Sequence, residues 1–405
     1  MPCCFRFNRV HHADNAHHVY RSLSSPRFLL GLVCSLLWGI FCTSLHAEPR
    51  LLRVGYVLDR SGPLVNDSRD FFAGAKVLLD EFNAKAGDKT IRQLVRESDG
   101  TPERTLQAAL ELARDDKVDV IVGLAGDAAL SALVDSPAFA REGVPLLAPL
   151  SGLRLPAASL GGRVFFSRAD YGQEIQYVVR YLRGVGLSRV VLVTQAGSPT
   201  GLQQAVRSAF TLAAAKTANQ AALTVDEIVL PAAGAARQSE LQRMAQTQAQ
   251  ALIVLGDSLD YAAVFQAYRR LSLGATVIGL STVNPRTVLE LVPSAKMSGA
   301  MLTQVMLNPA KTAIPLSREF ERVFKKYFDE QPSHQSLAGF VAAHQLLAAL
   351  GRISGPLNRV TLTSALQATV RLDVYGFEIN YATVPQRGSE FVDLLMIRAD
   401  GKLLQ

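Results

Sequence analysis

The sequence contains little cysteine and almost no tryptophan, and both are confined to its first 47 residues. These residues hold one tryptophan and all of the cysteines: Cys3, Cys4, Cys34 and Cys42. They have the layout of a secretory signal peptide, with four arginines, a 15-residue apolar run at Phe28–Cys42 and the small residue Ala47 at the cleavage position. After cleavage the protein would have neither a disulfide nor thiolate chemistry, so its core must stabilise it.

The apolar run is too short for a membrane anchor, since a transmembrane helix needs about 20 residues. A lipid anchor on Cys42 is the alternative, but Phe41 is larger than the residue that normally precedes a lipidated cysteine. We therefore expect cleavage near Ala47 and a periplasmic protein that is not stably inserted in the membrane.

An excess of charge of one sign is also missing. Removing residues 1–47 takes away four Arg and one Asp, which lowers the formal net charge from +7 to +4. The remaining charges are scattered along the chain, which argues against nucleic acid as a partner. We expect a monomer.

Common catalytic and cofactor motifs are absent from the sequence. It has no Gly-x-Ser-x-Gly elbow, no phosphate-binding loop and no His-Glu-x-x-His pair. Only two histidines follow residue 47, and one of them, His344, lies on the apolar stripe of a predicted helix. We therefore predict no catalytic residue, no bound metal and no cofactor.

A strand–loop–helix pattern recurs along the chain. Residues 118–122 form a β-branched apolar run, typical of a strand buried on both faces of a parallel sheet. Gly123 and Gly126 then open a turn, and Asp127 is a candidate N-cap for the next helix. The same pattern recurs at residues 190–201 and 252–258. Because ligands bind at the carboxyl ends of such strands, the repetition predicts a binding cleft.

The order of predicted elements indicates an α/β protein with two doubly wound parallel-sheet lobes joined by a multi-strand hinge. The predicted crossovers lie near Arg168, Val305 and Pro385. We expect these segments: a signal peptide (1–47), the first part of lobe I (48–168), lobe II (169–304), a return to lobe I (305–384), and a C-terminal hairpin that completes the hinge and lobe II (385–405).

Several segments resemble the leucine/isoleucine/valine-binding-protein family of exported solute-binding proteins, which have the type 1 periplasmic-binding fold. Residues 53–64 (RVGYVLDRSGPL) are similar to the first strand and ligand loop of that family, and residues 72–83 to its first helix. Residues 388–393 and 400–402 resemble its closing hairpin, and the likeness covers residues 51–405. It implies a hinged receptor that closes on a small polar solute, amino-acid-like or a related metabolite, and delivers it to the permease subunits of an ABC importer.

The resemblance also implies ligand contacts from the loops at the strand ends. In lobe I these loops contain Ser61, Gly126, Asp127, Ser151 and Gly152, and in lobe II they contain Tyr171, Thr200, Asp257 and Ser281. Family members that bind amino acids hold the ligand carboxylate with hydroxyl groups, where this chain has Asp127. A carboxylate there would repel that of a ligand, which argues against an ordinary α-amino acid.

Several alternatives stay open from the sequence. Asp127 serves either as an N-cap alone or as a ligand contact, and Tyr171 either stacks on the ligand or packs in the hinge. A sensory module of the same fold would signal to a partner instead of a permease. A hydrolase or other enzyme would depend on acids such as Asp127 or Asp257.

Overall fold

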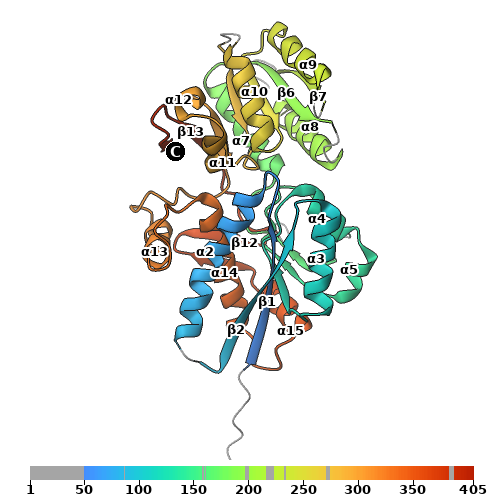
Figure 1. The fold of residues 1–405 in the computed structure, drawn as a ribbon, viewed down its shortest axis with the longest axis vertical. Coiled ribbons are helices and arrows are strands. Elements are labelled where there is room, and N and C mark those ends of the chain that lie inside the picture. Colours follow the sequence, from blue (N-terminus) through green and yellow to red (C-terminus); the bar gives the residue numbers. More distant parts are fainter. Residues whose placement is uncertain are drawn as a thin grey trace, which may run out of the picture. The chain divides into compact units, whose positions relative to one another are not determined.

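The computed structural model describes residues 50–405 except 86, 157, 158, 160, 197–199, 216–222, 232, 233, 271–273 and 383–386. The predicted signal peptide and Pro385 therefore lie outside the described residues. The described chain forms two lobes, each built on a mostly parallel sheet, and they are the lower and upper halves of Figure 1. The predicted fold class is confirmed.

Lobe I is built on five parallel strands in the order β2-β1-β3-β4-β5. Their bounds are β1 (Arg50–Asp59), β2 (Lys89–Ser98), β3 (Val120–Val122), β4 (Leu146–Leu147) and β5 (Val164–Phe165). Along β3 the side chains of Val120 and Val122 enter one core and that of Ile121 enters another. This alternation shows that both faces of the sheet are covered, as the apolar run predicts.

Helices from two parts of the chain cover this sheet. The first part supplies α2 (Val65–Ala84), α3 (Pro102–Arg114), α4 (Asp127–Val134) and α5 (Pro137–Glu142), and the later part supplies α13 (Pro315–Phe324), α14 (His334–Gly351) and α15 (Arg359–Gln367). Residues of α2, α13 and α14 share one core, and those of α3, α4 and α5 share the other. Thr101 is the N-cap of α3, because its hydroxyl accepts a hydrogen bond from the Arg104 amide, and Pro102 follows at the first helical position.

Lobe II is built on seven strands in the order β14-β13-β10-β9-β8-β6-β7. The strands are β6 (Arg189–Gln195), β7 (Thr224–Leu230), β8 (Ala251–Leu255), β9 (Thr276–Gly279), β10 (Met301–Gln304), β13 (Asp393–Ile397) and β14 (Leu403–Leu404). Its helices are α7 (Tyr171–Gly184), α8 (Thr200–Ala215), α9 (Ala235–Gln246), α10 (Ser258–Arg270), α11 (Pro285–Leu291) and α12 (Ser294–Met297). Side chains of β8 alternate between the two cores of this lobe.

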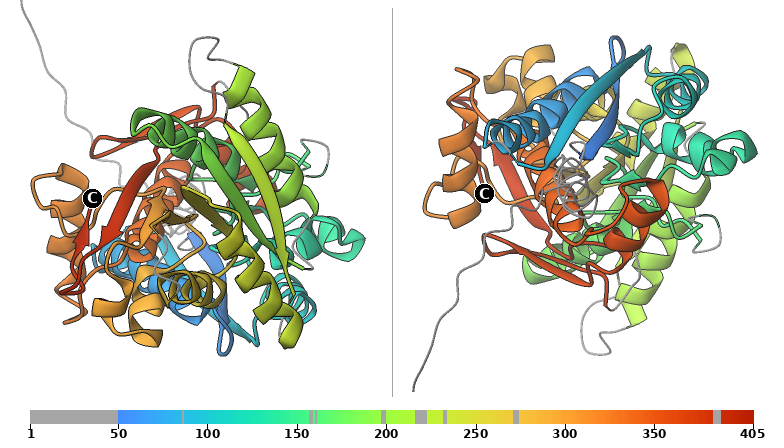
Figure 2. Two further views of the ribbon diagram at one scale, coloured as in Figure 1. Left: turned by 90° about the horizontal axis from the view of Figure 1, so that it is seen from above. Right: turned by 90° about the horizontal axis from the view of Figure 1, so that it is seen from below.

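The strands near the C-terminus belong to different sheets. β12 (Phe377–Asn380) pairs with β11 (Arg371–Val374) in a small hairpin, whereas β13 pairs antiparallel with β10 and with β14. In the view from above, the red strand β13 lies beside the orange strands of lobe II, although the segments between them belong to lobe I (Figure 2). Lobe II therefore contains antiparallel strands at one edge.

No helix among the described residues is long and apolar enough to cross a membrane.

Helices α2 and α14 approach each other closely through two glycines. A Cβ atom on Gly74 would lie 1.7 Å from the carbonyl oxygen of Ser336, and one on Gly339 would lie 1.9 Å from that of Phe71. Any side chain at either position would force the two backbones apart. This contact fixes α2, whose N-terminal turn faces the site described below.

We predict that Gly339→Ala lowers the free energy of unfolding by about 3 kcal/mol, because the added methyl group meets backbone and not a side chain that can move. Urea unfolding followed by far-UV circular dichroism measures the change. The control is Gly351→Ala in the same helix, where a Cβ meets nothing within 4 Å. The control should be neutral or stabilising by up to about 1 kcal/mol. Equal midpoints for wild type and Gly339→Ala would contradict the close packing.

Candidate ligand-binding site

A cavity of about 370 Å³ is lined by residues of both lobes. Lobe I contributes the start of α2, the loop before α4 and the start of α14, and lobe II contributes the loops that follow β6, β8 and β9. Apolar atoms form most of the lining surface. The polar side chains of the lining are those of Asp67, Asp127, Arg168, Tyr171, Gln195, Asp257, Ser281, Thr282, Gln304, His334 and Gln335.

Asp127 is not the N-cap that the sequence indicates. Helix α4 begins at Asp127 itself, and its N-cap is Gly126, which has a φ of 96°. The Asp127 carboxylate instead accepts hydrogen bonds from the Ser151 hydroxyl at 2.7 Å and from the Tyr171 hydroxyl at 2.9 Å. Burial raises the pKa of this carboxyl, against the opposing effect of the two hydroxyl groups. Since Tyr171 opens α7 of lobe II, this contact joins the two lobes.

A buried ion pair lies beside this contact. The Glu174 carboxylate is completely buried and accepts a hydrogen bond from the Arg168 guanidinium at 2.7 Å. It also accepts bonds from the Ser281 hydroxyl at 2.7 Å, the Ser281 amide at 2.9 Å and the Thr303 hydroxyl. Both carboxylate oxygens are thus satisfied, which a buried charge requires. The pair holds the first crossover, α7 and the ends of β9 and β10 together.

Asp257 is an N-capping residue that also lines the cavity. Its Oδ1 atom accepts hydrogen bonds from the Leu259 and Asp260 amides at the start of α10, at 2.8 and 3.0 Å. No hydrogen bond to its Oδ2 atom is present in the described part of the chain. Burial raises the pKa of this carboxyl. Asp257 therefore offers one oxygen to a ligand donor.

Several further polar atoms at the cavity have no hydrogen bond to another described residue, and one of them is Oδ2 of Asp67. Others are Nη1 of Arg168, Nε2 of Gln304 and Oε1 of Gln335. The side chains of Gln304 and Gln335 are almost completely buried. Because a buried polar atom without a hydrogen bond costs about 1–3 kcal/mol, these atoms are expected to bond to a ligand or to water.

Asp67 and His334 are buried titratable groups of the same lining. Burial raises the pKa of Asp67 to about 7, and the charge of Asp70 adds to this, while the amides of Asn284 and Gln335 oppose it. The Gln335 amide donates to Asp67 Oδ1 at 3.1 Å. Burial lowers the pKa of His334 to about 4, so this imidazole, which is bonded to Gln405, is neutral at pH 7.

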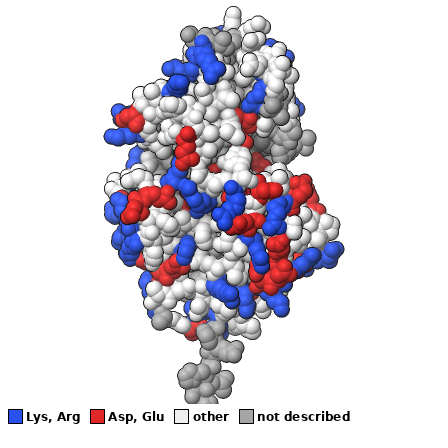
Figure 3. Space-filling view, in the orientation of Figure 1, with Lys and Arg blue, Asp and Glu red and all other residues white. Residues whose placement is uncertain are grey.

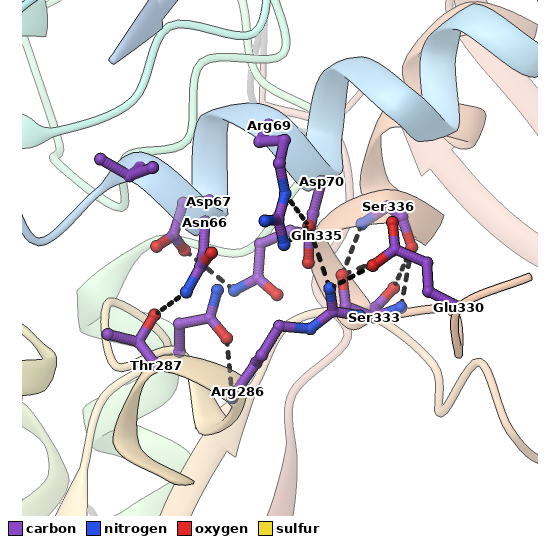
Figure 4. A network of polar contacts seen from close by, with 12 residues as sticks. Asn66, Asp67, Arg69, Asp70, Arg286, Thr287, Glu330, Ser333, Gln335 and Ser336 are labelled. Atoms are coloured by element: carbon purple, nitrogen blue, oxygen red, sulfur yellow. Dashed lines mark hydrogen bonds and ion pairs between the residues drawn. The ribbon is translucent and has the colours of Figure 1, made fainter. Parts of the chain in front are cut away.

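Polar contacts join the lobes at one side of the cavity (Figure 4). The Asn66 amide of α2 donates to the Thr287 hydroxyl at 3.0 Å and to Glu290 at 2.7 Å. Arg286, also from α11, donates to Glu330 at 2.8 Å and to Asp70 at 3.4 Å. We call these contacts of Asn66 and Arg286 the interlobe latch. They require α11 to lie against α2 and against the segment before α14, and therefore depend on the relative position of the lobes.

The structure brings together five of the nine residues that the sequence indicates. Gly126, Asp127, Tyr171, Asp257 and Ser281 line the cavity. Ser151 and Gly152 lie behind the lining, where Ser151 holds Asp127 and Gly152 leaves room for the Tyr171 ring. Ser61 is exposed and its hydroxyl donates to the Asp99 carbonyl, away from the cavity. Thr200 begins α8, but its side chain is not among those described.

Sequence reasoning missed Asp67, Arg168, Gln304 and Gln335. Arg168 and Gln304 lie at the predicted crossovers. For both, a polar residue next to a buried strand could have indicated a position at the cavity. Asp67 and Gln335 lie in the first turns of helices α2 and α14, where polar residues are common as capping groups. No sequence pattern distinguishes them from such residues. The described residues contain no cluster of side chains suited to a metal ion.

Comparison with known proteins agrees with this architecture. A substrate-binding periplasmic protein from Ralstonia solanacearum is 26% identical, with a TM-score of 0.75 over 87% of this chain and 99% of that one. The isoleucine complex of a branched-chain amino acid transporter substrate-binding protein from Streptococcus pneumoniae is 17% identical, with a TM-score of 0.74 over 88% of this chain and 98% of that one. The benzoate complex of a solute-binding protein from R. palustris is also 17% identical, with a TM-score of 0.72 over 87% of this chain and 95% of that one.

A search of curated proteins returned no match. The family model described as "Periplasmic binding protein" matches residues 52–401, which is nearly all of the described chain. The resemblance noted in the sequence is thereby confirmed, and the chain belongs to the periplasmic binding protein family.

Proposed function

We propose that this protein captures a small solute between its lobes and delivers it to an ABC importer after export to the periplasm. The observation that carries the proposal is the cavity lined by both lobes, whose lining includes Arg168, Gln304 and Gln335, each with a polar atom that has no hydrogen bond among the described residues. Its volume of about 370 Å³ suits a small metabolite. The family membership and the two neighbours named as ABC or amino acid transporter components support delivery to an importer.

The chemistry of the lining favours a small carboxylic acid with an apolar body. Arg168 Nη1 and Gln304 Nε2 are donors suited to a carboxylate, and the aliphatic lining suits a hydrocarbon group. Asp257 Oδ2 is an acceptor suited to an ammonium group, so amino acids and simple acids both belong to this class. The isoleucine and benzoate named for two of the neighbours are carboxylic acids with apolar bodies.

The proposed mechanism is a shift of population between open and closed arrangements of the lobes. A ligand that bonds to Gln335 of lobe I and Gln304 of lobe II binds only the closed arrangement fully, so it increases the closed population. The interlobe latch forms in the same arrangement and adds free energy to closure. The permease would then distinguish closed protein from open protein.

The first prediction concerns Gln304. We expect Gln304→Leu to lose most of the stabilisation by ligand while the free protein stays as stable or becomes more stable, because an unpartnered buried amide is removed. Thermal unfolding is measured without ligand and with a panel of aliphatic and aromatic carboxylic acids and amino acids. A ligand at 100 times its Kd adds about 2.7 kcal/mol to wild type.

Thr194→Val is the matched control, since Thr194 has an unpartnered hydroxyl in the core of lobe II and does not line the cavity. It should keep the full response to ligand. A panel without any hit on folded wild-type protein would contradict the proposed function. A hit that Gln304→Leu leaves unchanged would contradict the assigned site.

The second prediction is a pH dependence. With a pKa of about 7, Asp67 is mostly neutral at pH 6 and mostly ionised at pH 8, and only the ionised form repels a carboxylate ligand. Affinity for the carboxylate hit should therefore fall roughly 3- to 10-fold between pH 6 and pH 8. Titration calorimetry at both pH values measures this. The dependence should disappear in Asp67→Asn, and its persistence there would exclude Asp67 as the cause.

The third prediction concerns the interlobe latch. Arg286→Gln removes the contacts with Glu330 and Asp70, so the ligand-free protein should become more open and the ligand should dissociate ~5-fold faster. Small-angle scattering of ligand-free protein and stopped-flow dissociation test the two effects. Arg69→Gln is the control, because Arg69 bonds to the same Asp70 from within α2. If both variants behave like wild type, the latch does not contribute to closure.

A further inference from the structure

A second cavity, of about 490 Å³, shares no lining residue with the first. One side is formed by α7 of lobe II, including Gln176, Tyr177 and Arg180, and the other by residues between β12 and β13, including Arg387. Arg154, from the loop that follows β4, completes it. We call it the crossover hollow.

The crossover hollow contains more positive than negative charge. The guanidinium groups of Arg154 and Arg387 share a single carboxylate, that of Asp170, at 2.9 Å each. Arg180 has no carboxylate partner among the described residues, and its guanidinium lies 5.6 Å from the centre of the Tyr177 ring. Glu390 is the acid of the lining and is exposed, and the Asp393 carboxylate accepts a hydrogen bond from the Tyr177 hydroxyl at 3.2 Å. The lining therefore has three guanidinium groups and one carboxylate, and the carboxylates of Asp170 and Asp393 bond to its residues from outside the lining.

The shared carboxylate leaves several donors free. Asp170 is buried, and its carboxylate also caps α7 by accepting a hydrogen bond from the Gln173 backbone amide. This second bond holds the carboxylate in place, so it cannot reorient toward Arg154 or Arg387. Nη2 of Arg387 and all the nitrogens of Arg180, which is exposed to solvent, have no hydrogen bond to another described residue. Burial and the nearby Arg154 lower the pKa of Arg387. An anion in the hollow would relieve this repulsion and satisfy the free donors.

We propose that the crossover hollow is a second binding site, which takes a small oxyanion with at least two negative charges, either a polycarboxylate or a phosphate. Its lining is suited to this class because guanidinium forks bond to both kinds of oxygen pair. The amide of Gln176 and the hydroxyl of Ser389 lie in the same lining. Few aliphatic side chains line this hollow, unlike the first cavity, so it is not suited to an apolar solute.

The test is titration calorimetry of the purified protein with citrate and, separately, with inorganic phosphate. Sodium chloride is adjusted to keep the ionic strength constant, because screening alone changes the apparent affinity of exposed charges. We expect saturable binding of one anion per chain. Arg180→Gln should weaken it at least about tenfold, since the variant loses the arginine that lacks a carboxylate partner. Whichever of citrate and phosphate binds more tightly shows whether the site takes a polycarboxylate or a phosphate.

Two further variants make the result decisive. Gln176→Glu keeps all three arginines and adds a carboxylate to the hollow, so it should weaken binding as much as Arg180→Gln. Arg92→Gln removes the same charge from an exposed arginine on β2 and should bind the anion like wild type. Gln304→Leu, in the first cavity, should also leave anion binding unchanged. No saturable binding, or equal weakening in Arg92→Gln and Arg180→Gln, would overturn the proposal.

Discussion

The buried pair of Arg168 and Glu174 is the interaction on which the arrangement of the two lobes depends. Its members lie at the first crossover and on α7, and Ser281 and Thr303 bring the ends of β9 and β10 to the same carboxylate. Removing one member of such a pair leaves a charge without a partner in a dry interior, which typically costs about 3–5 kcal/mol. The geometry of the first crossover therefore depends on the ion pair between Arg168 and Glu174 staying intact.

This pair also determines which groups remain for a ligand. Glu174 is fully occupied by the protein, and the Asp127 carboxylate accepts bonds from Ser151 and Tyr171. Two of the acids near the cavity are thus committed to structure, while one nitrogen of Arg168 stays free. The first cavity consequently combines aliphatic side chains with several polar side chains, which is common among small-molecule sites. The crossover hollow differs, because its side chains are mostly polar and its arginines outnumber its acids. On the face shown in Figure 3, by contrast, basic and acidic side chains are interspersed.

Most of the fold could be predicted from sequence because its signals are local. Strand β3 and helix α3 follow from a β-branched run and from Thr101-Pro102, which need no tertiary information. The partners of β12 and β13 depend on contacts with distant segments, so apolar patterning does not show that they join different sheets.

The candidate site was less predictable from the sequence than the fold. A loop position indicates that Asp127 is near the cavity, but its bonding depends on Tyr171, 44 residues away. Asp67 and Gln335 are more than 260 residues apart and meet only through the packing of α2 on α14.

The discontinuous construction of both lobes has a consequence for the order in which the chain folds. Lobe I lacks α14 until residue 351 is available, the edge of β10 is unpaired until β13 is made, and β14 then pairs with β13. Neither lobe can complete its core from a growing N-terminal fragment, and the high contact order makes late strand pairing slow. Until then an unpaired strand edge is open to association with other chains. A protein of this topology benefits from a chaperone or translocation pathway that keeps the whole chain unfolded until its last strands arrive.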